Sequence, residues 1–258
     1  MFFAGESDLQ VSPGIWVCSM GHLTGLFDRD FLDIPATGRL TWLRYAEFHK
    51  VEGDVITESA TFIDILSLMH QAGVYPLPPS TGAMAIYPGP RTHDGLVTHA
   101  PDPAETRATY DLSTAMLTDL AQSYTSPADH LARWWHPDMN WFGPTGIGTS
   151  LGFPGYRRGH TGPFETLLDT VEIHDWELAV AAGNFSAVMW WPCLTMRNTG
   201  GYMGVPANDA LAHMRVVDLY RRDGDKLAEN WIFIDLLHFL NMQGVDLLTD
   251  NGGPDVQT

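Results

Sequence analysis

Basic residues are scarce in this chain. Lysine occurs only at positions 50 and 226, and 14 basic side chains oppose 31 acidic ones, which gives a formal net charge of −17. Such a charge repels the phosphates of nucleic acids and the headgroups of anionic lipids. We therefore expect neither nucleic acid nor a membrane among the partners of this protein.

Long apolar runs, a leader and a disulfide framework are also missing. No stretch approaches the roughly 18 consecutive apolar residues of a membrane-spanning helix. Residues 1–5 have no basic side chain, so they do not look like the start of a signal peptide. The two cysteines, Cys18 and Cys193, are too few for a disulfide scaffold. These absences predict a cytoplasmic protein.

Motifs for metal and phosphate binding are absent as well. The chain has no His-x-x-x-His or Cys-x-x-Cys pair, and His136-Pro137-Asp138 alone is too little for a metal site. The glycines between Gly143 and Gly152 lack the Gly-Lys-Ser/Thr ending of a phosphate-binding loop. We expect no metal ion and no cofactor.

An internal repeat is the main feature that is present. Residues 34–74 align without a gap with residues 205–245, and 13 of the 41 positions are identical. Average amino-acid usage gives about two or three identities by chance, so the alignment indicates two copies of one unit. Upstream, after a four-residue gap, Cys18 aligns with Cys193, and we interpret both as buried residues at one repeated strand position.

Each copy has the pattern of two strands joined by a turn with a central Gly, followed by a short helix. The expected strands are 39–49, 55–62, 210–222 and 226–234. An Asp precedes each expected helix as its N-cap and a Gly follows it, Asp64 and Gly73 in the first copy and Asp235 and Gly244 in the second.

Only the second copy has further elements before this unit. They are two helices at 102–122 and 126–135, a strand with a glycine-rich turn at 138–148, a short helix at 164–168, and strands at 171–182 and 185–195. The expected fold is α+β, with one complete and one partial copy. The expected divisions are a partial copy (1–75), a Pro/Gly-rich linker (76–105), a complete copy (106–248) and a tail (249–258).

Three motifs in the second copy carry a family resemblance. They are DMNWFGPTGIGT at 138–149, MRVVDLYR at 214–221 and DGDKLAENWIFID at 223–235. Together with the order of elements they resemble the SnoaL-like polyketide cyclases of the NTF2-like superfamily. The resemblance covers residues 106–248, and residues 11–75 as a second copy shortened at its N-terminus.

This resemblance implies a cone, in which a curved antiparallel sheet wraps around helices and holds a small, mostly apolar ligand. It also implies aldol chemistry without metal or cofactor, in which an acid on the last strand transfers the proton. The position of that acid, three residues before Asp235, is Ile232 here and Thr61 in the first copy. The family mechanism therefore cannot be transferred unchanged.

Strand alternation selects the candidate pocket residues. Folding the hairpin about Gly224 sets Asp218 roughly opposite Asn230. The residues expected on that face are Met214, Val216, Asp218, Tyr220, Asn230 and Ile232, and the resemblance implies that this face is the inner one. Burial would raise the pKa of Asp218 and suit it to proton transfer. The alternative is a structural acid held by Tyr or Arg.

Two histidines and one tryptophan complete the candidate site. We expect His160, after the glycine turn, or His174, on the next long strand, to reach the pocket. We expect Trp141 to pack on the ligand, because the resemblance places its strand along the cone. Arg215 and Glu229 recur as Arg44 and Glu58, so we interpret all four as structural residues at a contact between sheets.

These residues predict a cofactor-independent enzyme that acts by proton transfer on a small hydrophobic or aromatic carbonyl compound. The reaction would be a cyclisation, an isomerisation, or an aldol or retro-aldol cleavage. Asp218 and a histidine would exchange the proton, and Asn230 would stabilise an enolate oxygen. The alternatives are a non-catalytic binding protein and an epoxide or ester hydrolase that uses an activated water. We also expect a homodimer.

Overall fold

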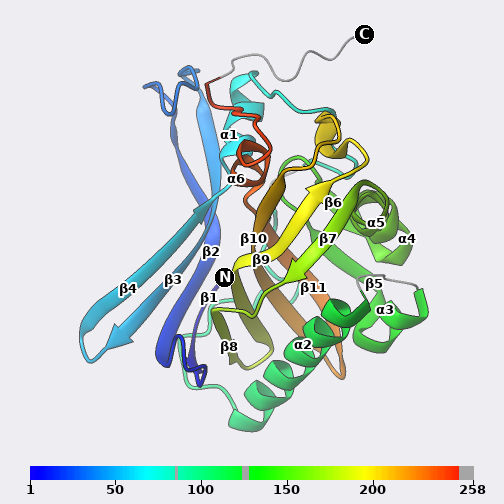
Figure 1. Ribbon diagram of the computed structural model, residues 1–258. Coiled ribbons are helices and arrows are strands. Elements are labelled where there is room, and N and C mark those ends of the chain that lie inside the picture. The colour runs from blue at the N-terminus through cyan, green and yellow to red at the C-terminus, as the bar shows by residue number, and fades with distance from the viewer. Residues whose placement is uncertain (85–86, 124–127, 250–258) are drawn as a thin grey trace.

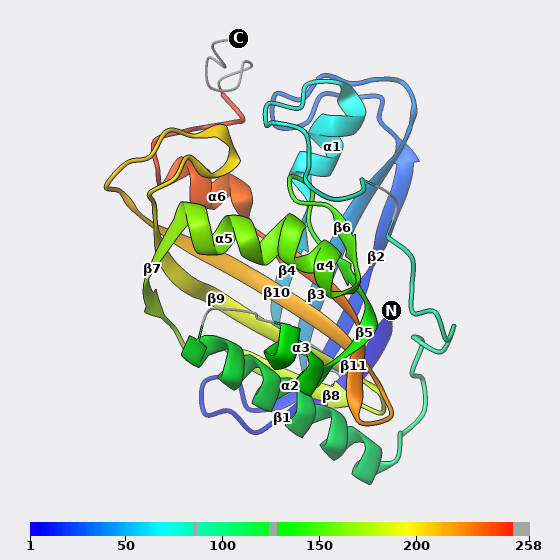
Figure 2. The same cartoon turned by 90° about the vertical axis from the view of Figure 1, so that its right-hand side faces the viewer.

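The computed structural model describes residues 1–84, 87–123 and 128–249, which form two β-sheets and a set of helices (Figures 1 and 2). The strands are β1 (Phe2–Ser7), β2 (Gly14–Leu26), β3 (Leu40–Glu52), β4 (Val55–Ile63), β5 (Trp135–Phe142), β6 (Thr149–Leu151), β7 (Leu168–Ile173), β8 (Leu178–Ala182), β9 (Phe185–Asn198), β10 (Leu211–Asp223) and β11 (Lys226–Ile234). The helices are α1 (Ile65–Ala72), α2 (Pro103–Ser123), α3 (Ala128–Trp134), α4 (Gly152–Tyr156), the π-helical turn η1 (Arg157–Thr161), α5 (Gly162–Leu167), the 3-10 turn η2 (Tyr202–Gly204) and α6 (Leu236–Asn241).

The two sheets are mainly antiparallel. The smaller has the order β1-β2-β3-β4, and its first strand was not expected from the sequence. The larger has the order β6-β5-β11-β10-β9-β7, with β8 also paired to β9, and the pair of β5 with β11 is parallel. The α+β class with curved antiparallel sheets, predicted from the sequence, is confirmed.

The two similar segments form the same elements in the same order. Adding 171 to the bounds of β3 and β4 gives the bounds of β10 and β11. Asp64 accepts a hydrogen bond from the backbone N–H of Ser67, and Asp235 accepts one from His238, so both N-caps form as predicted. An origin by duplication stays a prediction.

The predicted equivalence of the two cysteines is wrong. Leu43 pairs with Leu23, and its counterpart Met214 pairs with Leu194, so the upstream strands are also offset by 171 at that point. Beyond a bulge after Met214 the offset becomes 169, which makes Ala187 the counterpart of Cys18. A bulge changes the offset between two paired strands, and the sequence of one strand does not show where the bulge lies.

The smaller sheet packs on the outer face of the larger one, while α2, α3, α4 and α5 cover the inner face (Figure 1). Apolar side chains from both sheets fill the contact, because alternate residues of each strand point toward it. They include Phe3, Trp16, Cys18, Phe48 and Phe62 from the smaller sheet, and Phe142, Phe185, Leu219, Trp231 and Phe233 from the larger. The second copy therefore covers one face of the first.

Arg44, Glu58, Arg215 and Glu229 were all expected at a contact between sheets, but only two of these four side chains are buried. Arg44 and Glu229 are 1% exposed, whereas the side chains of their counterparts Arg215 and Glu58 are 27% and 55% exposed. Arg215 lies near Asp235 and over the ring of Trp191, and it does not meet Glu229. Only one member of each repeated pair is thus buried, because Arg44 lies between the two sheets and Glu229 lies against Arg221 and the backbone of Arg91, whereas Arg215 and Glu58 are partly open to solvent.

The segment 76–105, expected as a linker, packs along the larger sheet. Tyr87 is buried between the sheets, and Trp231 Nε1 donates a hydrogen bond of 2.8 Å to the carbonyl oxygen of Pro88. Ala83 forms a β-bridge with Thr149. Across the described ranges, no helix is both long and apolar enough to span a membrane.

Candidate functional site

A cavity lies between the inner face of the larger sheet and the helices that cover it. Its volume is about 970 Å³ when the open space at its mouth is included. Most of its wall is apolar or aromatic, as in many small-molecule sites. The polar lining residues that the chemistry below uses are Asp218, Tyr220, Asn230, Tyr156, His160 and Thr161.

Asp218 is the buried one of the two acids, Asp119 and Asp218, among the described residues that line this cavity. Its strand β10 turns it inward together with Met214 and Tyr220, and it is 6% exposed. Loss of hydration raises the pKa of its carboxyl group to about 7, and hydrogen bonds from Asn230 and Tyr220 offset only part of this effect. Asp218 therefore exists in both protonation states near neutral pH.

Asn230 holds this carboxyl group. Its Nδ2 donates to Asp218 Oδ1 at 3.0 Å and to the carbonyl oxygen of Leu219 at 3.1 Å. The residue opposite Asp218 is Ile232, because a bulge after Arg221 shifts the register, and Asn230 is the diagonal neighbour on the same face. Both N–H groups of the amide are thus occupied, so the expected contact between Asn230 and an enolate oxygen would break one of these bonds.

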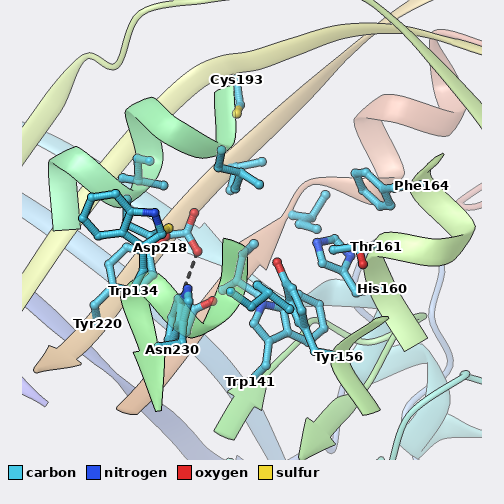
Figure 3. A pocket seen from close by; sticks show the side chains of 18 of the residues that line it. Trp134, Trp141, Tyr156, His160, Thr161, Phe164, Cys193, Asp218, Tyr220 and Asn230 are labelled. Atoms are coloured by element: carbon cyan, nitrogen blue, oxygen red, sulfur yellow. Dashed lines mark hydrogen bonds between the residues drawn. The ribbon is translucent and has the colours of Figure 1, made fainter. Parts of the chain in front are cut away.

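An aromatic wall lies across the cavity from Asp218. Figure 3 shows Trp141, Tyr156, His160 and Phe164 on this side, with the hydroxyl group of Tyr156 directed toward the space between His160 and Asp218. The His160 ring stacks on Trp141 with centroids 4.3 Å apart and an interplanar angle of 18°. The rings of Tyr156 and Phe164 also pack against His160, with their centroids 5.4 and 4.5 Å from the centroid of the His160 ring.

The sequence contains a signal for this wall that strand counting missed. Tyr156, His160 and Phe164 are four residues apart, the spacing that puts side chains on one face of a helix. The structure places all three on the continuous helical segment α4-η1-α5. The glycine turn after β5 brings Trp141 against them.

His160 is uncharged at neutral pH. It is half-buried among aromatic rings, and loss of hydration lowers its pKa to about 3. Its Nδ1 atom has no hydrogen-bond partner in the described part of the chain, nor do Thr161 Oγ1 and Trp190 Nε1. Because buried polar atoms are normally paired, these three atoms are candidates for contact with polar atoms of a ligand.

A bulge in β9 adds residues that the sequence did not predict for the site. Trp190 pairs with Val216 and Leu194 pairs with Met214, so five residues of β9 span the length of three on β10 at this point. Trp190, Cys193 and Leu194 consequently all line the cavity. Strict alternation would have turned Cys193 away.

The structure brings together seven of the eight predicted site residues. Asp218, Asn230, His160, Trp141, Met214, Tyr220 and Ile232 all line the cavity. His174 does not, and it is not on a strand as expected, because it follows Ile173, the last residue of the edge strand β7. Its Nε2 is 2.8 Å from Thr195 Oγ1, and its Nδ1 is 3.9 Å from Glu172.

Asp119 on α2 and His130 on α3 also line the cavity, with side chains 21% and 35% exposed. Trp134 Nε1 donates to Asp119 Oδ2 at 2.7 Å, which links α3 to α2. Within residues 1–84, 87–123 and 128–249, no three His, Cys, Asp or Glu side chains converge as metal ligands would.

Comparisons with known proteins give likenesses of fold only. No family model and no curated protein matches the chain. A protein from Jannaschia sp. CCS1 that is named as a SnoaL-like polyketide cyclase superposes with a TM-score of 0.44 at 16% identity. The match covers 56% of this chain and 96% of that one. NTF2-like proteins from Burkholderia thailandensis E264 and Burkholderia xenovorans LB400 give TM-scores of 0.41 and 0.40 at 17% and 14% identity, over 52% and 53% of this chain and 96% of each of theirs. At these TM-scores the likenesses establish neither a family nor an activity for this chain.

Proposed function

We propose that this protein is a cofactor-independent enzyme that moves a proton on a small hydrophobic or aromatic carbonyl compound bound in the cavity of residues 106–248. The observation that carries the proposal is the Asp218 carboxyl group, whose pKa burial raises to about 7 in an otherwise largely apolar cavity. A general acid or base works best when its pKa lies near the working pH. The structural alternative was an acid held by Tyr or Arg; Tyr220 does hydrogen-bond to Asp218, but no charged partner among the described residues lowers the pKa of Asp218 again.

The reaction begins with ionised Asp218. Its carboxylate takes a proton from the carbon next to the carbonyl group, the C–H electron pair becomes the C=C bond of an enolate, and the carbonyl oxygen gains the negative charge. Return of the proton to another carbon completes an isomerisation. Attack of the enolate carbon on a second carbonyl carbon forms the new C–C bond of a cyclisation, and the reverse step is an aldol cleavage.

Neutral hydrogen-bond donors stabilise the enolate oxygen in this scheme. Burial raises the pKa of the Tyr156 hydroxyl, which therefore stays protonated and able to donate. His160 is neutral, so it acts as a donor or acceptor and does not share the proton with Asp218 as the sequence suggested. Asn230 positions Asp218, and Trp141 contacts the face of the ligand.

The two alternatives from the sequence receive less support. Hydrolysis by an activated water was expected to use an Asp, an Asn and an Arg together, and the described lining contains Asp218 and Asn230 but no Arg. A non-catalytic binding protein has no use for an acid that titrates near neutrality. Burying such a group without a charged partner reduces the stability of the fold.

Proton exchange on an aromatic ketone tests this proposal. With 2-tetralone in D₂O, proton NMR follows replacement of the protons next to the carbonyl group. We expect the purified protein to accelerate this exchange, and Asp218→Asn to reduce the acceleration by about 10²–10⁴-fold, the usual contribution of a general base. The matched control is Asp138→Asn, whose carboxylate on β5 is 79% exposed and outside the lining.

Each other outcome has a defined meaning. Binding of 2-tetralone without accelerated exchange would favour the binding protein. Equal exchange in Asp218→Asn and Asp138→Asn would remove Asp218 from the mechanism. If the protein neither binds 2-tetralone nor accelerates its exchange, the proposed ligand class is wrong.

A further inference from the structure

Residues of the first half of the chain form hydrogen bonds with the backbone segments that carry the rings of the aromatic wall. Arg44, on β3 of the smaller sheet, is 1% exposed and lies between the rings of Tyr87 and Phe233, at 3.9 and 4.0 Å from their centroids. Its guanidinium donates to the carbonyl oxygens of Phe142 and Gly143, both at 3.2 Å, and of Ile232 at 2.9 Å. These carbonyl groups belong to β11, to the last residue of β5 and to the turn that follows it.

Asp64 forms hydrogen bonds with the same turn. Its Oδ1 caps α1 through the N–H of Ser67, and its Oδ2 accepts hydrogen bonds from the backbone N–H and the hydroxyl of Thr145, at 3.1 and 3.0 Å. The same Oδ2 is 4.0 Å from Arg44. A cation and an anion from the smaller sheet therefore hold successive peptide groups of residues 142–145.

Thr81 holds the partner of Trp141 in the stack. Its hydroxyl donates to the carbonyl oxygen of Gly159 at 2.7 Å, one residue before His160. The adjacent Gly82 N–H donates to Ile147 in the glycine turn at 2.7 Å. The backbones that carry the two stacked rings are thus both fixed by residues 44–82.

The turn and the Trp141 ring cannot move independently. A Cβ atom at Gly143 would lie 2.1 Å from the Trp141 ring, so the ring rests directly on this peptide. A displacement of the turn would therefore move the ring relative to His160, and aromatic contacts depend on such offsets.

The second copy offers a matched comparison. Arg215 and Asp235 occupy the positions equivalent to Arg44 and Asp64, and they form the equivalent ion pair, at 3.5 Å. Asp235 also caps its own helix, through His238. Neither residue donates to or accepts from the turn after Trp141, so the additional contacts are specific to the first copy.

We propose that Arg44, Asp64 and Thr81 are positioning residues of the cavity, which fix the Trp141–His160 stack and so make the cavity prefer planar aromatic ligands over aliphatic ones of similar size. This inference rests on the proposed function for the class of ligand. It gives Arg44 and Asp64 of residues 1–75, and Thr81 of residues 76–105, a role in specificity. Supporting contacts of this kind set the precision of a site.

Asp64→Asn and Asp235→Asn test it as a matched pair. Both remove the ion pair to the equivalent Arg, and both can keep the helix cap through the remaining oxygen, but only Asp64→Asn places an NH₂ group against the N–H of Thr145. Thr81→Val is a second variant of nearly equal shape, which removes the bond to Gly159 and leaves Asp64 in place.

The measurement is the ratio of affinities for acetophenone, whose ring is planar, and cyclohexyl methyl ketone, whose ring has the same number of carbons but is not planar, by isothermal calorimetry. We expect Asp64→Asn and Thr81→Val to lower this ratio by about 3- to 10-fold, the size of one aromatic contact, and Asp235→Asn to leave it unchanged. A purely structural role would change the folded fraction, which affects both affinities equally and cancels in the ratio. Equal ratios in the wild type, Asp64→Asn and Thr81→Val would overturn the inference.

A ligand-free measurement separates this inference from the proposed function. If the wild type binds neither ketone, the proposed ligand class is wrong, and amide exchange decides the positioning role. Asp64→Asn should then accelerate hydrogen exchange at Thr145 and change the near-ultraviolet circular dichroism of the Trp141–His160 stack, whereas Asp235→Asn should do neither. Unchanged exchange and dichroism in Asp64→Asn would refute it.

Discussion

Replacing Asp218 by Asn should change how the stability of the protein depends on pH. The carboxyl group has a pKa of about 7 in the folded protein, against 3.8 for an exposed Asp, because burial penalises the charged form. Between these values the unfolded chain releases the proton and the folded chain retains it. The free energy of unfolding therefore falls as pH rises through this range.

The size of the effect follows from the shift. Each pKa unit corresponds to about 1.4 kcal/mol, so a shift of roughly three units gives a penalty of about 4 kcal/mol at most once the pH exceeds the folded pKa. The penalty is absent below the pKa of the unfolded chain, where Asp218 is protonated in both states. Asn cannot ionise and therefore removes this dependence on pH.

Urea unfolding of the wild type and of Asp218→Asn between pH 4 and pH 8.5 measures how the free energy of unfolding of each depends on pH. The difference in free energy of unfolding, Asp218→Asn minus wild type, should grow by about 3–4 kcal/mol from the lowest to the highest pH. Any constant cost of the substitution cancels in this change. Parallel stability curves would refute the reasoning, because they would show that Asp218 titrates alike in the folded and unfolded chains.

Two further predictions concern other ionisable groups. The His160 ring should keep the NMR shifts of a neutral imidazole down to pH 5, because its pKa of about 3 lies below this range, and stability should fall as pH drops from 6.5 toward 3; a midpoint near 6.5 would contradict its burial among the aromatic rings. Glu229→Gln should cost about 3–5 kcal/mol in urea unfolding, because it takes the buried carboxylate from Arg221, whose other partner, Asp223, is 59% exposed. The equivalent Glu58→Gln in the first copy removes an exposed pair and should cost less than about 1 kcal/mol, so equal losses would show that burial does not set the cost.

Local features of the fold could be predicted from the sequence. The hairpins of both copies, the N-caps Asp64 and Asp235, and the α+β class follow from turn residues, caps and alternation, all of which act over a few residues. Alternation also placed Asp218, Tyr220 and Ile232 on one inner face. The observed partner of Asp218, Ile232, lies two residues beyond the expected Asn230, and a shift of two residues keeps each side chain on the same face.

The exact partners of the site residues could not be predicted in this way. The diagonal contact of Asn230 with Asp218 depends on the bulge after Arg221, and the entry of Cys193 into the cavity depends on another in β9. A bulge adds a residue to one strand of a pair, so its position is set by the packing of both strands and not by either sequence alone.

What the sequence by itself determined is therefore the two hairpins with their helix caps and the faces on which the side chains of β10 and β11 lie. Only the tertiary structure decided that His174 lies outside the cavity, that Arg44 is buried while Arg215 is not, and that Arg44 and Asp64 contact the turn after Trp141. Arg44 bonds to backbone atoms 98, 99 and 188 residues away. No local pattern specifies such contacts, because they arise only when two sheets pack and the buried guanidinium must find acceptors for its N–H groups.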